Sequence, residues 1–319
     1  MSANVMIRTA TSLRWRSARY LVAMCAVGAC TVAQAAISAS ERQVLLDIYA
    51  SANGPAWTAN SGWNGAPGTE CSWARVTCDA AQSHVVQIDL VSNNLSGTLP
   101  PSLTPLTALV FFSVDQNALT GSIPQIAGMT SLQYVYFSHN RFTGSLPSFN
   151  GLYNLDTFYA HVNLLTGVIP PMSDLAHLRT IGINNNALSG PLPTPVAGSV
   201  LTYIYLGNNQ FSGTIPDFHV LSDLAELTLD HNQLTGPLPN LSGTNLTTIY
   251  VNNNHLSGAL PAAPSTLAPN NSGLCPNLFD TTPSANDAAW NIATGATPWW
   301  ATPSSTNFCD EIFPDSFEA

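Results

Sequence analysis

The side chains best suited to acid–base or metal chemistry recur along the chain instead of gathering in one segment. His139 and His161 fall in consecutive segments of a repeating pattern, and so do Asp89 and Asp115. Imidazole and carboxylate groups can act as general acids and bases or bind a metal ion. Neither pair is joined by a nucleophile with a base and an orienting group, and no two carboxylates flank an expected pocket. The sequence therefore predicts a binding protein rather than an enzyme, with no cofactor and no metal.

Aromatic residues recur in the same pattern and suit binding better than catalysis. A tyrosine ring combines an apolar face with a hydroxyl tip, a combination that interfaces favour. Tyrosine is also favoured at exposed strand positions by propensity and cross-strand packing, so a purely structural role stays open. The candidate ligand-binding residues are Phe111, Tyr134, Tyr136, Tyr159, Tyr203, Tyr205 and Tyr250, with His139, His161 and Asp230 beside them.

Four cysteines lie beyond the first 35 residues, namely Cys71, Cys78, Cys275 and Cys309. An even number of cysteines in an exported chain favours disulfides, and four cysteines allow three pairings. A zinc site is the alternative, but no two of these cysteines form a C-x-x-C pair. Proximity in the sequence favours Cys71–Cys78 near the start and Cys275–Cys309 near the end.

A repeating motif sets the spacing of the candidate residues. The pattern N-x-[LF]-[ST]-G-x-[IL]-P occurs eight times, and successive copies begin 22 to 24 residues apart. Such a period is the signature of a solenoid, in which each repeat forms one coil. Stacked asparagines can satisfy backbone groups inside each bend, because an amide side chain both donates and accepts hydrogen bonds. The asparagines that begin the motif are Asn93, Asn117, Asn140, Asn163, Asn186, Asn209, Asn232 and Asn254.

A short alternating strand precedes each motif asparagine. In the seventh repeat Leu227 and Leu229 lie two residues apart and so point to one face, as a half-buried strand requires. One coil cannot bury this face alone, whereas stacked coils share a continuous core. The residues six and four positions before each asparagine then face outward on a concave sheet. The candidate aromatic residues occupy these outward positions.

The repeats carry a family resemblance. Leu95–Pro100 reads L-S-G-T-L-P and Leu234–Pro239 reads L-T-G-P-L-P, and both resemble the plant-specific class of leucine-rich repeat. That class is found in plant receptor-kinase ectodomains and polygalacturonase-inhibiting proteins. The stretch from Trp57 to Cys78 resembles its N-terminal cap, and Asn271–Cys275 is similar to its C-terminal cap. A helix is expected over Glu41–Tyr49, with Ser40 and Gln43 placed for a capping box.

The resemblance implies the fold class. An α/β leucine-rich-repeat solenoid is expected, shaped as a right-handed horseshoe or superhelix. Its parallel β-sheet would be concave, and its convex side would be 3-10 or irregular. A helical cap would close the N-terminal end, and a disulfide-stapled cap would close the C-terminal end.

Residues 1–35 have the layout of a secretory signal peptide, with a basic start, an apolar run over residues 20–29 and small residues before position 36. That run is too short to span a membrane, and no later stretch is long enough. Secretion is therefore predicted, with the periplasm as an alternative. Val27–Cys30 also resembles a bacterial lipobox, which would anchor the protein to the cell surface through a lipid on Cys30. The other expected domains are the N-terminal cap at 36–84, eight repeats at 85–266, and the C-terminal cap and tail at 267–319.

The charge of the chain disfavours two classes of partner. Beyond residue 35, four arginines face 18 acidic residues, a formal net charge of −14. So acidic a surface repels phosphate backbones and anionic lipid, and neither nucleic acid nor a membrane surface is expected as a partner.

Together these patterns favour a secreted recognition module that binds a protein or glycan ligand on its concave face. A structural or adhesion role at the cell surface is the alternative. Resemblance to polygalacturonase-inhibiting proteins suggests a third role, the inhibition of a secreted polysaccharide-degrading enzyme. The ending from Cys309 to Glu318 resembles tails on exported proteins of some gammaproteobacteria, which indicates a bacterial member of the class. The sequence leaves the ligand and the oligomeric state open.

Overall fold

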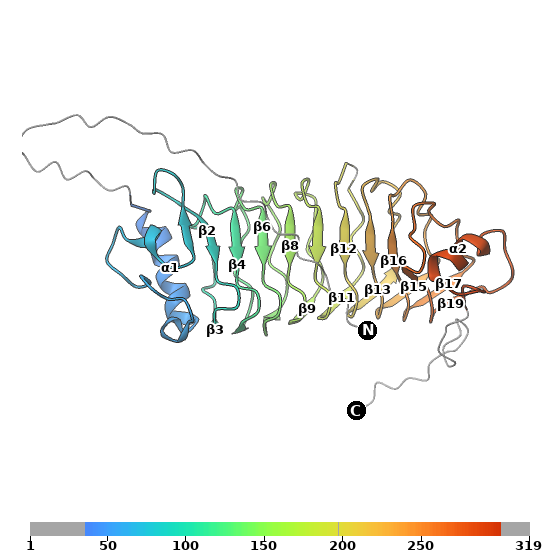
Figure 1. Ribbon diagram of the computed structural model, residues 1–319, viewed down its shortest axis with the longest axis horizontal. Coiled ribbons are helices and arrows are strands. Elements are labelled where there is room, and N and C mark those ends of the chain that lie inside the picture. Colours follow the sequence, from blue (N-terminus) through green and yellow to red (C-terminus); the bar gives the residue numbers. More distant parts are fainter. Residues whose placement is uncertain (1–35, 197, 301–319) are drawn as a thin grey trace, which may run out of the picture. The chain divides into compact units, whose positions relative to one another are not determined.

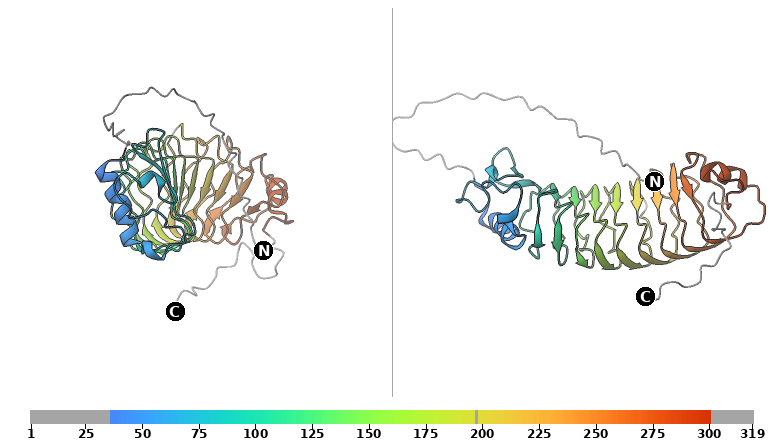
Figure 2. Two further views of the ribbon diagram at one scale, coloured as in Figure 1. Left: turned by 60° about the vertical axis from the view of Figure 1, so that its left-hand side comes forward. Right: turned by 60° about the horizontal axis from the view of Figure 1, so that its bottom comes forward.

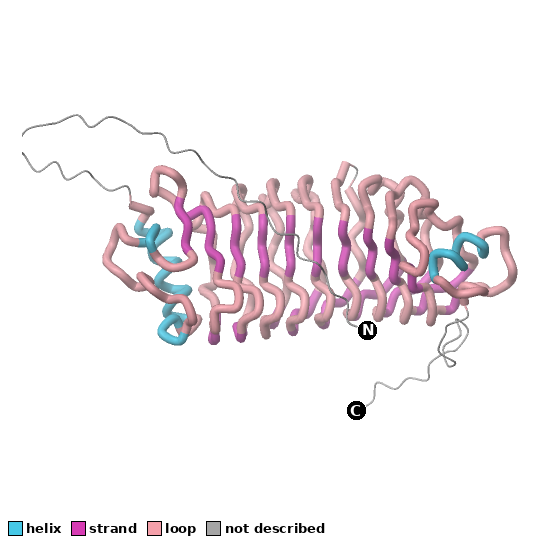
Figure 3. Tube along the Cα trace, viewed as in Figure 1, coloured by secondary structure: helices cyan, strands magenta, loops and turns pink. Residues whose placement is uncertain are grey.

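Parallel strands stacked side by side build the body of the protein. The computed structural model describes residues 36–196 and 198–300, which form a solenoid with a helix-bearing segment at each end (Figure 1). Each coil, named here by its motif asparagine, gives one strand to a ten-stranded sheet that we call the principal sheet (Figure 3). In order, its strands are β1 (Val76–Cys78), β2 (Val85–Asp89), β4 (Phe111–Ser113), β6 (Tyr134–Tyr136), β8 (Thr157–Tyr159), β10 (Thr180–Gly182), β12 (Tyr203–Tyr205), β14 (Glu226–Thr228), β16 (Thr248–Tyr250) and β18 (Ser272–Gly273).

The register of the principal sheet is the same from coil to coil. Ile181 at the centre of β10 pairs with Phe158 in β8 and with Ile204 in β12. From β2 to β18 every pairing is parallel, whereas β1 lies antiparallel to β2 at the N-terminal edge. From β4 to β16 the central residue of each strand of this sheet is buried, so the first and third residues face outward.

A second sheet runs along another side of the same coils (Figure 2). It is built from the [ST]-G part of the motif, where glycine lowers strand propensity, and the sequence did not predict it. Its seven strands are β7 (Thr143–Gly144), β9 (Leu164–Gly167), β11 (Ala187–Gly190), β13 (Gln210–Thr214), β15 (Gln233–Gly236), β17 (His255–Gly258) and β19 (Leu278–Phe279), and β3 (Ser96–Thr98) pairs separately with β5 (Ala118–Thr120).

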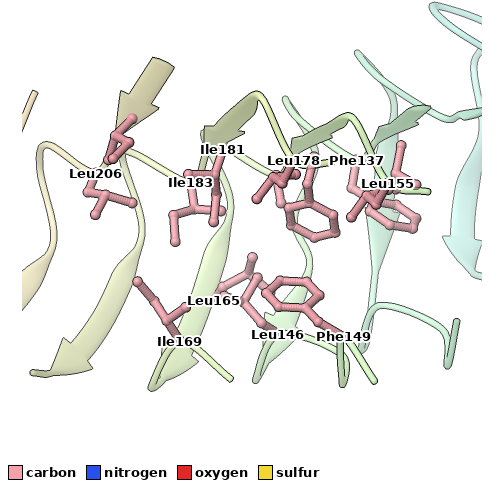
Figure 4. Close-up of a cluster of buried hydrophobic side chains, with 14 of the residues drawn as sticks. Phe137, Leu146, Phe149, Leu155, Leu165, Ile169, Leu178, Ile181, Ile183 and Leu206 are labelled. Atoms are coloured by element: carbon pink, nitrogen blue, oxygen red, sulfur yellow. The ribbon is translucent and has the colours of Figure 1, made fainter. Parts of the chain in front are cut away.

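The core is a continuous column of apolar side chains inside the coils (Figure 4). Phe149 and Phe158 pack edge to face with ring centroids 5.2 Å apart, and Phe137 contacts Phe158 at 6.2 Å. Leu155, Leu178 and other residues of successive coils continue the column. No coil buries these side chains alone, so stacking is the source of apolar burial.

The motif asparagines tie each coil to the one before it. The Asn163 amide donates to the carbonyls of Ala160 and His161 in its own coil at 3.2 and 3.3 Å, and to Phe137 of the preceding coil at 3.0 Å. Its oxygen accepts the backbone N–H of Phe142 at 2.9 Å. One side chain thus satisfies buried backbone groups of two coils.

The hydrogen-bonded series of asparagines extends beyond the predicted eight at one end and meets the N-terminal cap at the other. Asn277 makes the same contacts, accepting from Leu256 N–H at 2.9 Å and donating to Val251 at 2.8 Å. It closes a ninth coil that the proline-ended motif did not detect. At the other end, Asn93 bonds the backbone N–H and carbonyl of Ala59 in the cap.

The residue before each of the eight predicted asparagines adopts a left-handed backbone conformation, which turns the chain out of the strand. Asn185, Asn208 and Asn253 have φ near 56° here, in a region that asparagine tolerates. Val162 occupies the same position with φ of 55°, although its branched Cβ makes this conformation costly. The Asn163 coil therefore carries local backbone strain.

The N-terminal cap begins with helix α1 (Ala39–Ser51), and the predicted capping box is wrong by two residues. Ser38, not Ser40, is the N-cap: its hydroxyl accepts from Glu41 N–H at 3.1 Å, and the Glu41 carboxylate accepts from Ser38 N–H at 3.0 Å. Glu41 wins over Gln43 because a buried carboxylate at this place also accepts from Val85 N–H at 3.3 Å. Gln43 instead donates to Asp47 at 2.7 Å.

Tryptophans and a disulfide complete this cap. Trp57 and Trp63 pack edge to face at 4.9 Å, and the indole of Trp63 lies 5.2 Å from that of Trp73. Cys71 and Cys78 form a disulfide with their Cα atoms 5.4 Å apart. Two short 3-10 helices, η1 (Gly54–Ala56) and η2 (Glu70–Ser72), also lie in the cap.

The C-terminal cap contains helix α2 (Asp287–Thr294), which the sequence did not predict. The Trp290 indole is fully buried and donates to the Pro261 carbonyl at 2.9 Å, and Asn271 N–H donates to the Ala293 carbonyl at 3.0 Å. Cys275 is disulfide-bonded, whereas its predicted partner Cys309, the signal peptide and the lipobox Cys30 lie outside the described residues. Among the described residues, no helix is long and apolar enough to cross a membrane.

We expect Asn163→Ala to lower the free energy of unfolding by about 2–3 kcal/mol, because several buried backbone groups lose their partner. Denaturant titration followed by circular dichroism measures the change. Asn150→Ala is the matched control, since Asn150 is exposed, and it should change stability by less than about 0.5 kcal/mol. Equal effects of the two substitutions would contradict a stabilising role of the asparagine.

We expect Val162→Asn to raise the free energy of unfolding by about 1 kcal/mol, because asparagine tolerates the left-handed conformation that strains valine. The same titration tests it. Val168→Asn replaces another exposed valine of the coil, one without positive φ, and should give no gain. A gain shared by both variants would show that replacing any exposed valine by a polar side chain stabilises the protein, whatever its backbone conformation.

Candidate functional site

The outward side of the principal sheet carries every predicted aromatic residue. β4, β6, β8, β12 and β16 each place one or two of them at the first or third strand position. Phe112, Val135 and Phe158 lie between these positions and are buried in the core. The coil register therefore converts a sequence spacing of about one repeat into adjacency on one face.

Five side chains on this face form a continuous series of ring contacts that we call the aromatic strip: Phe111, Tyr136, Tyr159, His161 and His139. Phe111 lies 5.5 Å from Tyr136, and Tyr136 stacks on Tyr159 with centroids 5.8 Å apart and planes 22° apart. Tyr159 meets His161 edge to face at 5.6 Å, and His161 meets His139 at 4.8 Å. These are the separations at which aromatic pairs stabilise each other.

A glycine on the neighbouring strand determines where the Tyr159 ring lies. The next strand, β10, has Gly182 at the equivalent position, and a Cβ there would overlap the Tyr159 ring. Tyr159 therefore lies over Gly182 instead of standing away from the sheet. Gly182 is a part of the site that a search for functional side chains could not find.

A second cluster lies two coils further on. Tyr203 and Tyr205 stack with centroids 6.3 Å apart, and the Tyr205 hydroxyl donates to Glu226 at 2.8 Å. Asp230 lies 3.0 Å from the His231 imidazole, and its carboxylate leans over Gly207. Glu226 was not predicted as a site residue, although its place six before Asn232, diagonal to Tyr205, is the signal that identifies it.

Tyr134 and Tyr250 lie on the same face but outside both clusters. Among the described residues, neither belongs to a ring contact with another aromatic side chain. Phe111 reaches across to Tyr136 on the diagonal instead of contacting Tyr134, its direct partner in the register. Tyr250 donates its hydroxyl to Asn271 at 3.5 Å, which ties it to the C-terminal cap.

Burial changes the protonation of the polar groups around the strip. Burial, with a smaller effect of His139, lowers the pKa of His161 to about 4, so this imidazole is neutral near pH 7. Burial raises the pKa of Asp115 to about 6 and that of Tyr159 to about 12. Burial and the hydrogen bond to Glu226 raise the pKa of Tyr205. Near neutral pH, Tyr159 and His161 are thus both uncharged.

The described residues hold no group of three His, Cys, Asp or Glu side chains that could bind a metal ion. Among the described residues, the polar groups of this face contact rings and carboxylates.

Family comparison matches this architecture. Residues 38–79 match the leucine rich repeat N-terminal domain, and residues 84–106, 131–152, 200–219 and 245–267 match the Leucine Rich Repeat. The chain is therefore similar to leucine-rich-repeat proteins, both in an N-terminal domain and in four of its repeats.

Relatives and solved structures agree on the class. The receptor protein kinase WSS1 of Oryza sativa is 40% identical over 67 residues, which are 21% of this chain and 7% of the relative. The PEPR1–AtPEP1 crystal structure has a TM-score of 0.64 at 28% identity, covering 80% of this chain and 37% of that one. The Arabidopsis thaliana ectodomain of GASSHO1/SCHENGEN3 in complex with CASPARIAN STRIP INTEGRITY FACTOR 2 has a TM-score of 0.64 at 26% identity, covering 76% and 30%.

The match thus spans less than a tenth of the relative WSS1 and under two fifths of either structure. These proteins are plant receptors, and they give no support to the bacterial source predicted from the C-terminal tail.

We expect Asp115→Asn and His161→Asn to tilt the pH dependence of stability in opposite directions. Asp115 has a raised pKa, so its contribution is present below pH 3.8 and is lost as the pH rises through about 6. His161 has a lowered pKa, so its contribution is present above pH 6.5 and is lost as the pH falls through about 4. Between pH 4 and 7, Asp115→Asn should gain about 2 kcal/mol relative to the wild type as the pH rises, and His161→Asn should gain as the pH falls.

Denaturant titrations at a series of pH values measure the free energy of unfolding of each variant and show how it changes with pH. His177→Asn, which replaces an exposed histidine outside the strip, is the control. Curves that run parallel for all the variants would show that neither group is perturbed by the fold.

Proposed function

We propose that this chain is an exported recognition module that binds a protein ligand, through an extended peptide segment, on the outward side of the principal sheet. The aromatic strip carries the proposal, because it places a continuous row of rings across three adjacent strands. Concave repeat surfaces are the common binding faces of solenoids. The similarity to PEPR1 with AtPEP1 and to GASSHO1/SCHENGEN3 with its factor supports a protein ligand.

The charges of the face select the chemistry of the ligand. The Glu226 carboxylate accepts from Tyr205, and Asp230 lies beside His231. Asp115 is close enough to raise the pKa of Tyr159, while the strip histidine His161 is neutral near pH 7. A peptide with lysine or arginine next to apolar side chains matches this surface. Arginine over tyrosine adds a cation–π contact, and a carboxylate nearby holds the charge.

A glycan is the second candidate ligand. The stacked pair Tyr136–Tyr159 presents ring faces and hydroxyls together, which suits a sugar that is apolar on one face and hydroxylated at its edge. An adhesion role and inhibition of a polysaccharide-degrading enzyme would use the same face with a larger partner.

The proposal includes export and the domain organisation predicted above. The Cys71–Cys78 disulfide favours an oxidising compartment. Residues 1–35 would be removed on export, residues 36–84 would form the N-terminal cap, and residues 267–319 would form the C-terminal cap and tail. The intact mass of the exported protein tests this, because cleavage after Ala35 and lipidation at Cys30 give different masses.

We expect Tyr136→Ala/Tyr159→Ala to weaken ligand binding at least tenfold while the protein stays folded, because aromatic anchors carry much of the energy of such interfaces. Immobilised wild type and variant would be compared on a phage library of random peptides and on a glycan array. Enrichment of basic peptides by the wild type and by the control, but not by the double variant, supports the proposal. The matched control is Tyr153→Ala, since Tyr153 is 54% exposed and lies outside the principal sheet.

Enrichment of one glycan class, lost in the double variant and kept in the control, would replace the peptide by the glycan. Equal enrichment by all three proteins would place the binding surface elsewhere and overturn the proposal.

A further inference from the structure

One coil lacks the core side chains that its neighbours supply. Nine residues after the motif asparagine, the neighbouring coils place Phe149, Met172, Phe218 and Leu241, but the Asn186 coil places Pro195. Twelve residues after it, the Asn140, Asn163 and Asn209 coils place Leu152, Leu175 and Leu221, where the Asn186 coil has Gly198. Gly198 lacks the whole leucine side chain, and Pro195 is much smaller than the phenylalanines Phe149 and Phe218.

The result is a cavity of about 90 Å³ within the solenoid. Its walls are apolar and come from three successive coils, with Ile169, Leu175, Leu192, Leu201, Ile204 and Phe218 among them. The exposed residues Ser173, Thr194 and Val196 also line it, so the cavity reaches the surface. The cavity lies on the inner side of the principal sheet, next to core residues such as Ile181 and Ile204, and away from the outward side chains of that sheet.

The solenoid cannot close this cavity by collapse. Asn186 accepts from Leu165 N–H and Asn209 from Leu188 N–H, each at 3.0 Å, so the asparagines hold the coils on both sides at their regular spacing. In the second sheet, β11 pairs with β9 and with β13 in the same register. A void that its surroundings cannot fill keeps its full energetic cost, and an apolar void does not gain from water.

We propose that this cavity is a binding site for one apolar small molecule, up to about the size of a single aromatic ring. An apolar cavity of about 150 Å³ made by removing a leucine from another protein binds benzene and xenon. The cavity described here is smaller but open at its rim. The proposal does not depend on the ligand of the principal sheet, because the two sites share no residue.

Methionine positions make the proposal directly testable. Beyond residue 35 the chain has two methionines, Met129 and Met172. Met172 lines the cavity, whereas Met129 is buried two coils away. With methyl-13C-methionine in the full-length protein, added benzene should shift the Met172 methyl resonance saturably and leave that of Met129 unchanged.

A substitution at position 195 provides a second test of the proposed site. Pro195→Phe restores the side chain that Phe149 and Phe218 supply in other coils, and it should weaken benzene binding at least tenfold. Pro191→Phe makes the same change in the same coil at an exposed position outside the cavity, and it should keep the Met172 shift. If Pro195→Phe does not fold, Pro195→Met takes its place, because Met172 fills the equivalent position of the preceding coil.

Absence of a Met172 shift in the wild type at saturating benzene would overturn the proposal. So would equal shifts of both methionines, which indicate nonspecific partitioning, or a shift that survives Pro195→Phe unchanged. These outcomes are independent of the peptide and glycan experiments on Tyr136 and Tyr159.

Discussion

Each coil must satisfy the backbone N–H and C=O groups that its own bends bury. A coil of about one repeat turns through tight bends, and each bend places N–H and C=O groups inside the core, where water cannot reach them. The motif asparagine satisfies such groups once per coil. Its side-chain oxygen accepts a backbone N–H of the preceding coil, and its amide group donates to backbone carbonyls of both coils, as Asn163 shows. Because the same bonds recur, the distance and register between coils are fixed before any apolar contact is considered.

Because the register is fixed, residues at equivalent positions of successive repeats lie side by side on one face of the sheet. Tyr136 and Tyr159 are distant in the chain, yet their strands pair residue for residue, so their rings stack. The columns alone do not decide which rings touch, because a long side chain can lean along or across the strands. Phe111 takes the diagonal to Tyr136, and Tyr159 lies toward Gly182. Gly182 therefore shares in setting where the Tyr159 ring lies.

The sequence predicts those parts of the structure in which local chemistry and period agree. The eight asparagines, the outward columns and the Cys71–Cys78 pair are of this kind, since each follows from spacing along the chain. It misses Asn277, although the spacing of 23 residues from Asn254 is regular, because the [ST]-G-x-[IL]-P part of the motif is absent after Phe279. The capping box moves to Ser38 and Glu41 because Glu41 also bonds residues distant in sequence. Ring contacts, the Tyr205–Glu226 bond and helix α2 depend on tertiary neighbours, which no local pattern encodes.

The Asn186 coil shows how hydrogen bonding and packing divide the work of holding the solenoid together. On its outward side this coil has Gly182 and on its inward side Pro195 and Gly198, so it contributes less side-chain volume than its neighbours on both faces. Packing alone would make it the weakest layer. Its asparagine bonds are nevertheless as short as those elsewhere, with Asn186 donating to Ala160 and Ile183, each at 3.0 Å. Hydrogen bonds from the asparagines therefore hold neighbouring coils together in a layer that has few apolar contacts. The same property lets one coil lose volume, and so create a cavity, without breaking the sheet that supports the aromatic strip.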